Sequence, residues 1–347
     1  MKLLTKTTDY YETIKLANKL TGEYDKSVIF HCYWHGNLNE KHLYSILSCY
    51  YFNVLNRKHK IILWLENNTP NDINKEISKY CEIKQFSLQT EKEKSEFLIN
   101  YNYKFGGITF YSDFARVLLL YNYGGCWFDL DCFFLRSFDP IFKNYEKEVC
   151  VYQWENKNYP NNAIFISLEP KCVKMKNNIE FIINRNRGWG FQEARLTYDL
   201  PLEMLVLPCS WFNGSWIQNP YNIGTSNFFE NTEKEYTFYN FFNGAFCYHW
   251  HNKWNKPIED NSIIKQLVQI IKKETSASST SGLPGKKKET TGKKKTTGKK
   301  KSTASGEVST PAKKKKATGG KKSSIRQKSA GSDRRSLTRK LKTKRTE

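Results

Sequence analysis

The sequence of 347 residues lacks long hydrophobic runs. It contains no stretch of 18 consecutive apolar residues, so we predict no membrane-spanning helix. Residues 1–15 contain no apolar segment of the kind that forms the centre of a secretory signal peptide. These two absences together predict a soluble, cytoplasmic protein.

Paired cysteines are also absent. The nine cysteines form an odd number, and none of them stands in a Cys-x-x-Cys pair. A disulfide framework needs an even set, and structural zinc sites commonly use such pairs. We therefore expect free, buried thiols in a reducing compartment.

The C-terminal part has no aromatic residues and few acidic ones. Residues 275–347 contain 24 Lys and Arg but four Asp and Glu, whereas residues 1–274 contain 32 and 30. With so few apolar side chains this segment cannot offset the entropy cost of ordering, so we predict a folded domain over 1–274 and a disordered basic tail over 275–347. The tail is either a solvated extension or a non-specific contact for nucleic acid and other polyanions, and without aromatics it cannot stack on bases.

The folded part alternates between strand and helix patterns. Apolar runs predict strands at 28–34, 61–65 and 82–88, separated by helices at 42–57 and 72–80, and a last helix at 261–273. Such alternation is typical of an α/β fold with parallel strands.

The most informative stretch is residues 111–136. We predict a helix from Ser112, as its cap, to about Tyr123, with Asp113 and Arg116 on one face. Gly124-Gly125 ends this helix, because glycine accepts the left-handed conformation. A strand at 126–129 follows.

Asp129 and Asp131 come at the end of that strand. If the strand continues, their carboxylates project from one side and repel each other unless a cation lies between them. Oxygen ligands suit Mn²⁺ or Mg²⁺, which would neutralise charge on a leaving diphosphate. An isolated Asp-x-Asp is more often a solvated turn, but the helix carrying Asp113 and Arg116 and the end of a buried strand favour a site.

A complete longer pattern surrounds these residues. The arrangement S-D-x-x-R-x-x-x-L-Y-x-x-G-G-x-W-x-D-x-D is present from Ser112 to Asp131. It resembles the glycosyltransferases with a DXD-containing sugar-binding region (family 32), which include α1,4-galactosyl-, α1,4-N-acetylglucosaminyl- and initiating α1,6-mannosyltransferases. Similar segments stand at 30–36, 161–164, 189–197 and 245–255, although Glu193-Ala194 replaces the family's usual Gly-Pro.

The resemblance implies a GT-A fold, with one Rossmann-like mixed sheet flanked by helices, a nucleotide-sugar donor, a divalent cation and retention of anomeric configuration. It implies that Asp129 and Asp131 hold the metal and the donor diphosphate. His249 would be the third protein ligand, with His251 as its alternative.

The remaining predicted site residues surround the donor. By the resemblance, Asp113 and Arg116 grip the donor sugar, Trp34 lies near the nucleobase, and Gln192 lines the β-face of the donor. Further contacts to the donor are predicted for Gly125, Asn162 and Trp254.

We therefore expect transfer of a hexose or N-acetylhexosamine from a nucleotide sugar, favouring UDP, to a glycan or glycoprotein acceptor. One alternative is an inactive domain whose tail binds polyanions. Another is transfer onto a protein side chain. The many Asn, Lys, Tyr and Ile residues suggest a large-DNA-virus or bacterial origin.

Overall fold

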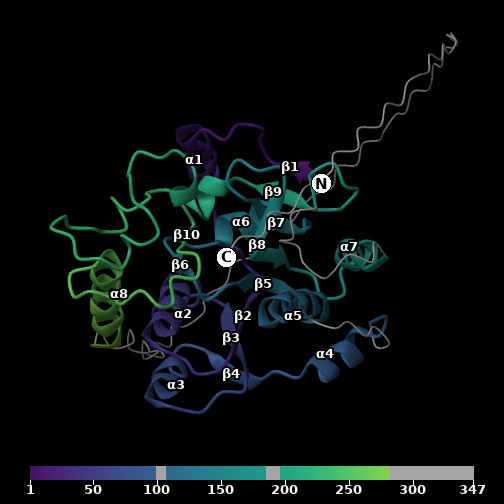
Figure 1. The fold of residues 1–347 in the computed structure, drawn as a ribbon, viewed down its shortest axis with the longest axis horizontal. Coiled ribbons are helices and arrows are strands. Elements are labelled where there is room, and N and C mark those ends of the chain that lie inside the picture. The colour runs from purple at the N-terminus through teal and green to yellow at the C-terminus, as the bar shows by residue number, and fades with distance from the viewer. Residues whose placement is uncertain (99–106, 185–195, 281–347) are drawn as a thin grey trace, which may run out of the picture. The chain divides into compact units, whose positions relative to one another are not determined.

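A mixed sheet of eight strands forms the centre of the protein. The computed structural model describes residues 1–98, 107–184 and 196–280, and the sheet order is β1-β9-β7-β8-β5-β2-β3-β4 (Figure 1). β8 runs antiparallel to both of its neighbours, whereas β5, β2, β3 and β4 are parallel. The strands are β1 (Lys2–Leu3), β2 (Ile29–His35), β3 (Lys60–Glu66), β4 (Glu82–Gln85), β5 (Gly125–Phe128), β7 (Cys150–Gln153), β8 (Pro160–Ser167) and β9 (Leu205–Leu207).

A second, two-stranded sheet follows directly from β5. It pairs β6 (Cys132–Phe134) with β10 (Cys247–His249) in antiparallel register, so that His249 stands opposite Cys132. This pairing brings the C-terminal part of the domain next to Asp131. The predicted single mixed sheet flanked by helices is confirmed.

Helices cover both faces of the central sheet, because β2 alternates its side chains between two cores. Phe30 and Cys32 pack in the core that contains α2, and Tyr33 packs in the core that contains α5. Figure 1 shows α2 and α5 on opposite sides of β2. The helices are α1 (Tyr10–Lys19), α2 (Glu40–Asn53), α3 (Asp72–Ile77), α4 (Leu88–Ser95), α5 (Ile108–Tyr123), α6 (Asp139–Asn144), α7 (Val173–Asn184) and α8 (Ile263–Thr280), with 3₁₀ turns η1 (Cys209–Trp211) and η2 (Gly214–Trp216).

Most predicted elements in the first half of the chain are confirmed within a few residues. The predicted role of Ser112 as a helix cap is wrong, since α5 begins at Ile108 after Gly107 and places Ser112 in its second turn. The last helix is also longer than predicted and reaches Thr280. Among the described helices, none combines the length and apolar character that crossing a membrane requires.

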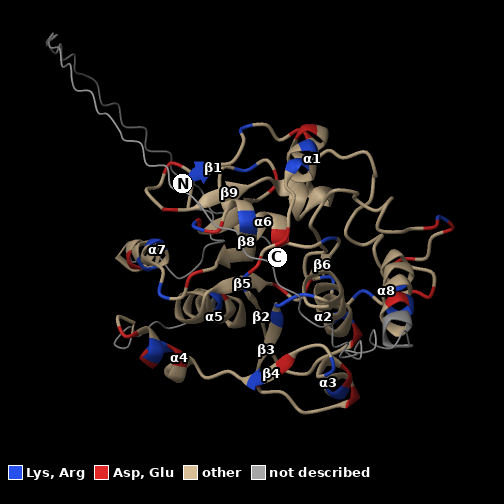
Figure 2. Ribbon diagram, turned by 180° about the vertical axis from the view of Figure 1, so that it is seen from behind, with Lys and Arg blue, Asp and Glu red and all other residues tan. Residues whose placement is uncertain are grey.

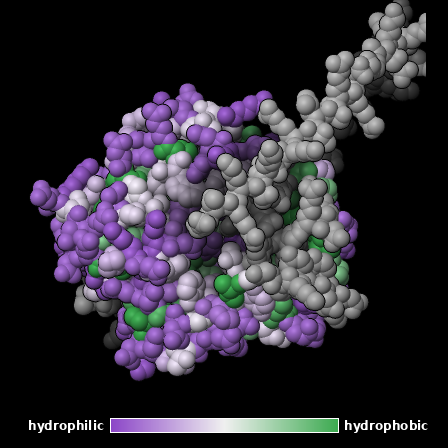
Figure 3. Space-filling view, in the orientation of Figure 1, coloured by the Kyte–Doolittle hydropathy of each residue, from purple (hydrophilic) through white to green (hydrophobic). Residues whose placement is uncertain are grey.

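Charges of both signs alternate over the surface of the helices. Figure 2 shows Lys and Arg interspersed with Asp and Glu, in keeping with the near balance of charge in residues 1–274. Figure 3 shows a mainly hydrophilic face with scattered hydrophobic spots.

The Gly124-Gly125 pair lets β5 start directly against β2. Both glycines have positive φ, +64° and +115°, and a Cβ atom at position 125 would lie 2.2 Å from the carbonyl oxygen of Ile29. We predict that Gly125→Ala lowers the free energy of unfolding by at least about 2 kcal/mol, as measured by urea unfolding. Gly107→Ala is the control, because a Cβ atom there meets nothing within 4 Å. Equal stability of the two variants would contradict this role.

A buried carboxylate ties α6 to the start of β2 and β3. Asp139 accepts hydrogen bonds from His59 Nε2 at 2.6 Å and from Arg57 Nε at 3.0 Å, and His59 Nδ1 accepts from the Val28 N–H at 3.1 Å. Burial alone would raise the pKa of Asp139, but the hydrogen bonds from His59 and Arg57 lower it below its ordinary value. This contribution to stability is present above the unfolded pKa of about 4 and is lost as the pH falls through the folded pKa.

We therefore predict that Asp139→Asn lowers the free energy of unfolding by about 2 kcal/mol at pH 7. The difference from the wild type should shrink as the pH falls below about 4, because the wild-type carboxyl is then protonated as well. Urea unfolding between pH 3 and 7 measures this, with Asp72→Asn on the exposed surface as the control. A loss that stays constant over this range would show that the carboxylate charge is not involved.

Candidate functional site

Asp129 and Asp131 lie in a tight turn between β5 and β6. The strand predicted at 126–129 is confirmed as β5, which ends at Phe128 and does not continue through Asp131, so the condition for two carboxylates on one side of a strand is not met. The Asp129 N–H donates to the Ala163 carbonyl at 2.8 Å, and the Cys132 N–H donates to the Asp129 carbonyl at 2.9 Å. Fastened to β8 in this way, the turn directs the two carboxylates to different partners.

Asp129 belongs to a buried network around Arg116. Its Oδ1 accepts from Trp127 Nε1 at 2.7 Å and lies 3.3 Å from Arg116 Nη2, which also lies 2.9 Å from Asp113 Oδ1. Arg116 Nη1 donates to the side chain and the backbone carbonyl of Asn162 at 2.7 and 2.8 Å. The predicted shared face of Asp113 and Arg116 is thus confirmed. Burial raises the pKa of Asp129, and Arg116 opposes this rise.

Asp131 pairs instead with His249. Their Oδ1 and Nε2 atoms are 3.1 Å apart, and Asp131 Oδ2 accepts from the Asn252 N–H at 2.8 Å. Burial alone would raise the pKa of Asp131, but His249 and the Asn252 N–H lower it to about 2. The Tyr152 hydroxyl lies 2.8 Å from His249 Nδ1 and orients the ring. Asp131 is therefore a carboxylate at neutral pH, facing a fixed imidazole.

The two histidines of this segment, His249 and His251, have different hydrogen-bond partners. His251 Nε2 accepts from the Asn213 side-chain amide at 2.7 Å, and its ring stacks on Trp216 at 3.6 Å. His251 and Asn252 both have left-handed backbones, with φ of 48° and 53°. Such conformations cost about 1 kcal/mol or more each, and here they aim the Asn252 N–H at Asp131. Of the two rings, His249 is the one whose Nε2 faces Asp131.

The side chains of Asp131 and His249 are suited to binding a divalent cation. Among the His, Cys, Asp and Glu side chains of the described ranges, Asp131, Cys132 and His249 bring ligand atoms within 4.8 Å of one another. Burial raises the pKa of the Cys132 thiol well above its usual value, so it is a poor ligand. One carboxylate and one imidazole leave coordination positions for phosphate oxygens, as Mn²⁺ or Mg²⁺ sites commonly have. Asp129 lies outside this group, on the side of Arg116.

A cavity of about 330 Å³ opens over both aspartates. Two of the residues that line it, Arg116 and Asn161, carry buried N–H groups (Nε and Nδ2) that have no hydrogen-bond partner in the part of the chain that the structure describes. Asn161 Oδ1 accepts from the Ala163 N–H at 2.7 Å, which fixes the orientation of the amide. The lining residues are Tyr33, Trp34, His35, Ile108, Thr109, Ser112, Arg116, Asp129, Leu130, Asp131, Trp154, Asn161, His249, His251, Asn252 and Trp254.

A buried donor without a partner costs about 1–3 kcal/mol, so a ligand whose acceptor oxygens reached these two N–H groups would gain from pairing with them. Sugar hydroxyls and phosphates are such ligands. The cavity also has the size of a small-molecule site, about 300–1,000 Å³.

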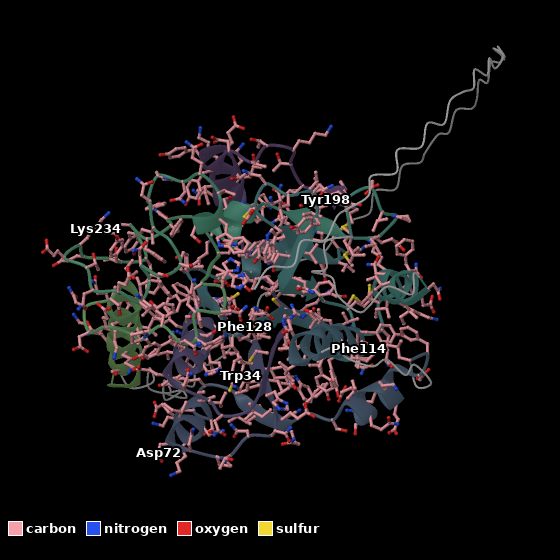
Figure 4. The ribbon with its side chains drawn as sticks, in the orientation of Figure 1. Trp34, Asp72, Phe114, Phe128, Tyr198 and Lys234 are labelled. Atoms are coloured by element: carbon pink, nitrogen blue, oxygen red, sulfur yellow. The ribbon has the colours of Figure 1, made fainter. Side chains whose placement is uncertain are left out.

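Two tryptophans line the β2 end of the cavity. The Trp34 and Trp254 rings lie 4.6 Å apart, and His42 stacks on Trp254 at 4.4 Å. The buried Lys41 ammonium donates to the backbone carbonyls of Trp254 and Lys256, so the first turn of α2 fastens the segment that carries Trp254. In Figure 4, Trp34 lies near the centre of the view and Asp72 near its edge.

The other predicted residues lie in different places. Asn162 accepts a hydrogen bond from Arg116 and is not among the residues that line the cavity. Gly125 packs against Ile29 at the start of β5 and does not line the cavity either. Gln192 lies outside the described residues, as do residues 281–347 of the predicted tail, whereas its first residues, 275–280, continue α8.

Sequence reasoning missed three residues of the site. Tyr152 and Trp154, at the end of β7, stand in no recognisable pattern. Asn161 lies in the similar segment at 161–164, but its place beside the aspartate turn depends on the pairing of β8 with β5, which no local pattern reveals.

Comparisons with known proteins agree with this site. Residues 48–148 match the family described as glycosyltransferase sugar-binding region containing DXD motif. This range includes the helix with Asp113 and Arg116 and the turn with Asp129 and Asp131. No curated protein matches the chain.

Several solved glycosyltransferases are distantly similar. The PaToxG glycosyltransferase is 17% identical, over 56% of this chain and 72% of that one, with a TM-score of 0.31. GlyE of Streptococcus pneumoniae TIGR4 is 13% identical, over 58% and 47%, with a TM-score of 0.36. Mouse xyloside xylosyltransferase 1 is 12% identical, over 67% and 100%, with a TM-score of 0.38.

The matched residues therefore include a central part of the site. The Arg116 network, the aspartate turn and the cavity above them all lie in or against residues 48–148. That segment matches the family of glycosyltransferase sugar-binding regions containing a DXD motif, and the match supports a transferase activity for this chain.

Proposed function

We propose that this enzyme transfers a hexose or N-acetylhexosamine from a UDP-linked sugar to a glycan or glycoprotein acceptor. The observation that carries the proposal is the meeting of two kinds of group in one cavity. Arg116 and Asn161 offer unpartnered N–H donors, and Asp131 and His249 form a pair suited to a cation. A nucleotide sugar has hydroxyls for the first and a diphosphate for the second.

Each group then has a role in donor binding. Asp131 and His249 would hold the cation, which supplies Lewis-acid stabilisation to the leaving diphosphate when it is bound. Arg116 and Asn161 donate to sugar hydroxyls, while Asp113 keeps Arg116 in place. Trp34 lies on β2, at the far side of the cavity from Asn161 in the sheet order, and is our candidate for contact with the nucleobase. We further propose retention of anomeric configuration, which is supported by the motif resemblance.

A donor screen with the full chain tests the proposal. Nucleotide release is measured for UDP-, GDP- and CMP-linked sugars with a panel of neutral sugar acceptors, with Mn²⁺ or with EDTA. We expect release from a UDP-sugar with Mn²⁺ and its loss in EDTA. A folded chain that releases nucleotide from no donor would overturn the proposal.

Product analysis separates the finer alternatives. Mass spectrometry distinguishes a glycan product from a glycosylated protein side chain, and the anomeric proton coupling in the product reports retention or inversion. An inverted product, or sugar found only on protein side chains, would require the corresponding part of the proposal to be replaced.

A further inference from the structure

A second aromatic group lines the same cavity on the side of β7. It consists of Trp154, Trp216 and His251, which we call the β7 aromatic group. The Trp154 and Trp216 rings meet edge to face at 4.6 Å, and His251 lies 5.8 Å from Trp154. Trp154 and His251 line the cavity together with Asp131 and His249.

The sheet order separates this group from Trp34. β2 is one neighbour of β5, and β8 followed by β7 lies on the other side. β2, β5 and β7 all run in the same direction, because β8 is antiparallel to both β5 and β7. Trp34 near the end of β2, Asp129 after β5 and Trp154 after β7 therefore lie along one edge of the sheet, with the aspartate turn between the two aromatic groups.

The β7 aromatic group is held in one arrangement. His251 stacks on Trp216 with an interplanar angle of 13°, and its Nε2 accepts from Asn213 at 2.7 Å, which leaves the ring proton on Nδ1. The backbone N–H of Trp154 donates to the Tyr159 carbonyl at 3.2 Å, which holds the chain at this position. Trp154 itself is half-buried, so part of its ring faces the cavity while its neighbours fix its position.

We propose that Trp154 is the stacking platform for a neutral sugar ring of the acceptor, supported by Trp216 and His251. This inference rests on the proposed function. The apolar C–H face of a pyranose packs on an indole ring, and a rigid aromatic surface gives contact area at low entropy cost. We propose above that the nucleotide binds on the side of the cavity that carries Trp34. The Trp154 ring lies on the other side of the aspartate turn, where it is available to the acceptor sugar. The acceptor class is therefore a glycan rather than a protein side chain.

Saturation-transfer difference NMR tests the platform without turnover. The full chain with UDP and diamagnetic Mg²⁺, which leaves the proton signals sharp, is titrated with the methyl glycosides of glucose, galactose, mannose and N-acetylglucosamine. We expect C–H signals from at least one of these sugars with the wild type, and their loss by at least about fivefold in Trp154→Ala and Trp154→Leu. Trp154→Phe should keep most of the signal, since it retains an aromatic face. Tyr239→Ala, which removes an aromatic ring that is 86% exposed, is the matched control and should change nothing.

The UDP signals in the same samples separate the two hypotheses. If the wild type shows no UDP signal, the proposed function itself fails. If UDP binds but no sugar gives a signal, or if sugar signals persist unchanged in a folded Trp154→Leu variant, the platform is overturned and the donor site stands. Trp154→Leu keeps the inference testable even where Trp154→Ala does not fold, because it retains most of the side-chain volume.

Discussion

Asp131→Ala is expected to reduce nucleotide-sugar turnover by at least about 100-fold, equivalent to about 2.7 kcal/mol of transition-state stabilisation. The carboxylate has two tasks that no neighbour can take over. It faces His249 Nε2 at 3.1 Å, and it accepts the Asn252 N–H at 2.8 Å from a strained backbone. Without this carboxylate, His249 Nε2 loses the oxygen that it faces, and the Asn252 N–H loses its acceptor.

Two variants distinguish chemistry from folding. Asp131→Asn keeps the shape and can still accept the Asn252 N–H, so we expect it to retain a folded domain but to lose turnover. Asp72→Ala removes an aspartate from the exposed surface and should behave as the wild type. Initial-rate measurements at saturating Mn²⁺, with circular dichroism for folding, provide the comparison. Activity in Asp131→Asn close to that of the wild type would show that the charge is not needed.

Arg116→Ala is expected to lower the free energy of unfolding by about 3–5 kcal/mol and to abolish donor binding. The guanidinium is 2% exposed and lies between two carboxylates, Asp113 at 2.9 Å and Asp129 at 3.3 Å. Without it, both carboxylates lose the guanidinium that lies between them. Urea unfolding and UDP-sugar titration calorimetry measure the two effects.

The partners of Arg116 supply the matched controls. Arg116→Lys keeps the charge but not the fork that reaches Asn162, so it should recover part of the stability and little of the donor affinity. Adding Asp113→Asn to Arg116→Ala should restore stability relative to Arg116→Ala alone, because it removes one of the two carboxylates that the guanidinium faces. Additive losses in the double variant would argue against the coupling of these two residues.

The sequence contained enough information for the parts of the site that depend on local spacing. Asp113 and Arg116 stand three residues apart on α5 and form the ion pair that this spacing allows. The end of α5 at Tyr123 and the left-handed Gly124 follow from glycine's conformational freedom. The β-strand alternation that separates Phe30 from Tyr33 was equally readable.

The residues that were mispredicted or missed depend on contacts that are distant in sequence. The turn at Asp129 forms because its N–H pairs with Ala163 on β8, and no local pattern reveals this hydrogen bond. Tyr152 matters only because β10 brings His249 to its hydroxyl. Asn161 acts through a lone N–H in a cavity wall, which is visible only once the strands are assembled.

Titration of Mn²⁺ by electron paramagnetic resonance tests the central claim most directly, namely that Asp131 and His249 hold a cation together with the donor diphosphate. We predict one bound Mn²⁺ per full-length chain, with an affinity that UDP strengthens and that Asp131→Asn and His249→Gln each reduce by at least about tenfold. Asp72→Asn should leave the titration unchanged. Mn²⁺ binding that neither UDP nor the two site substitutions alter would contradict the claim.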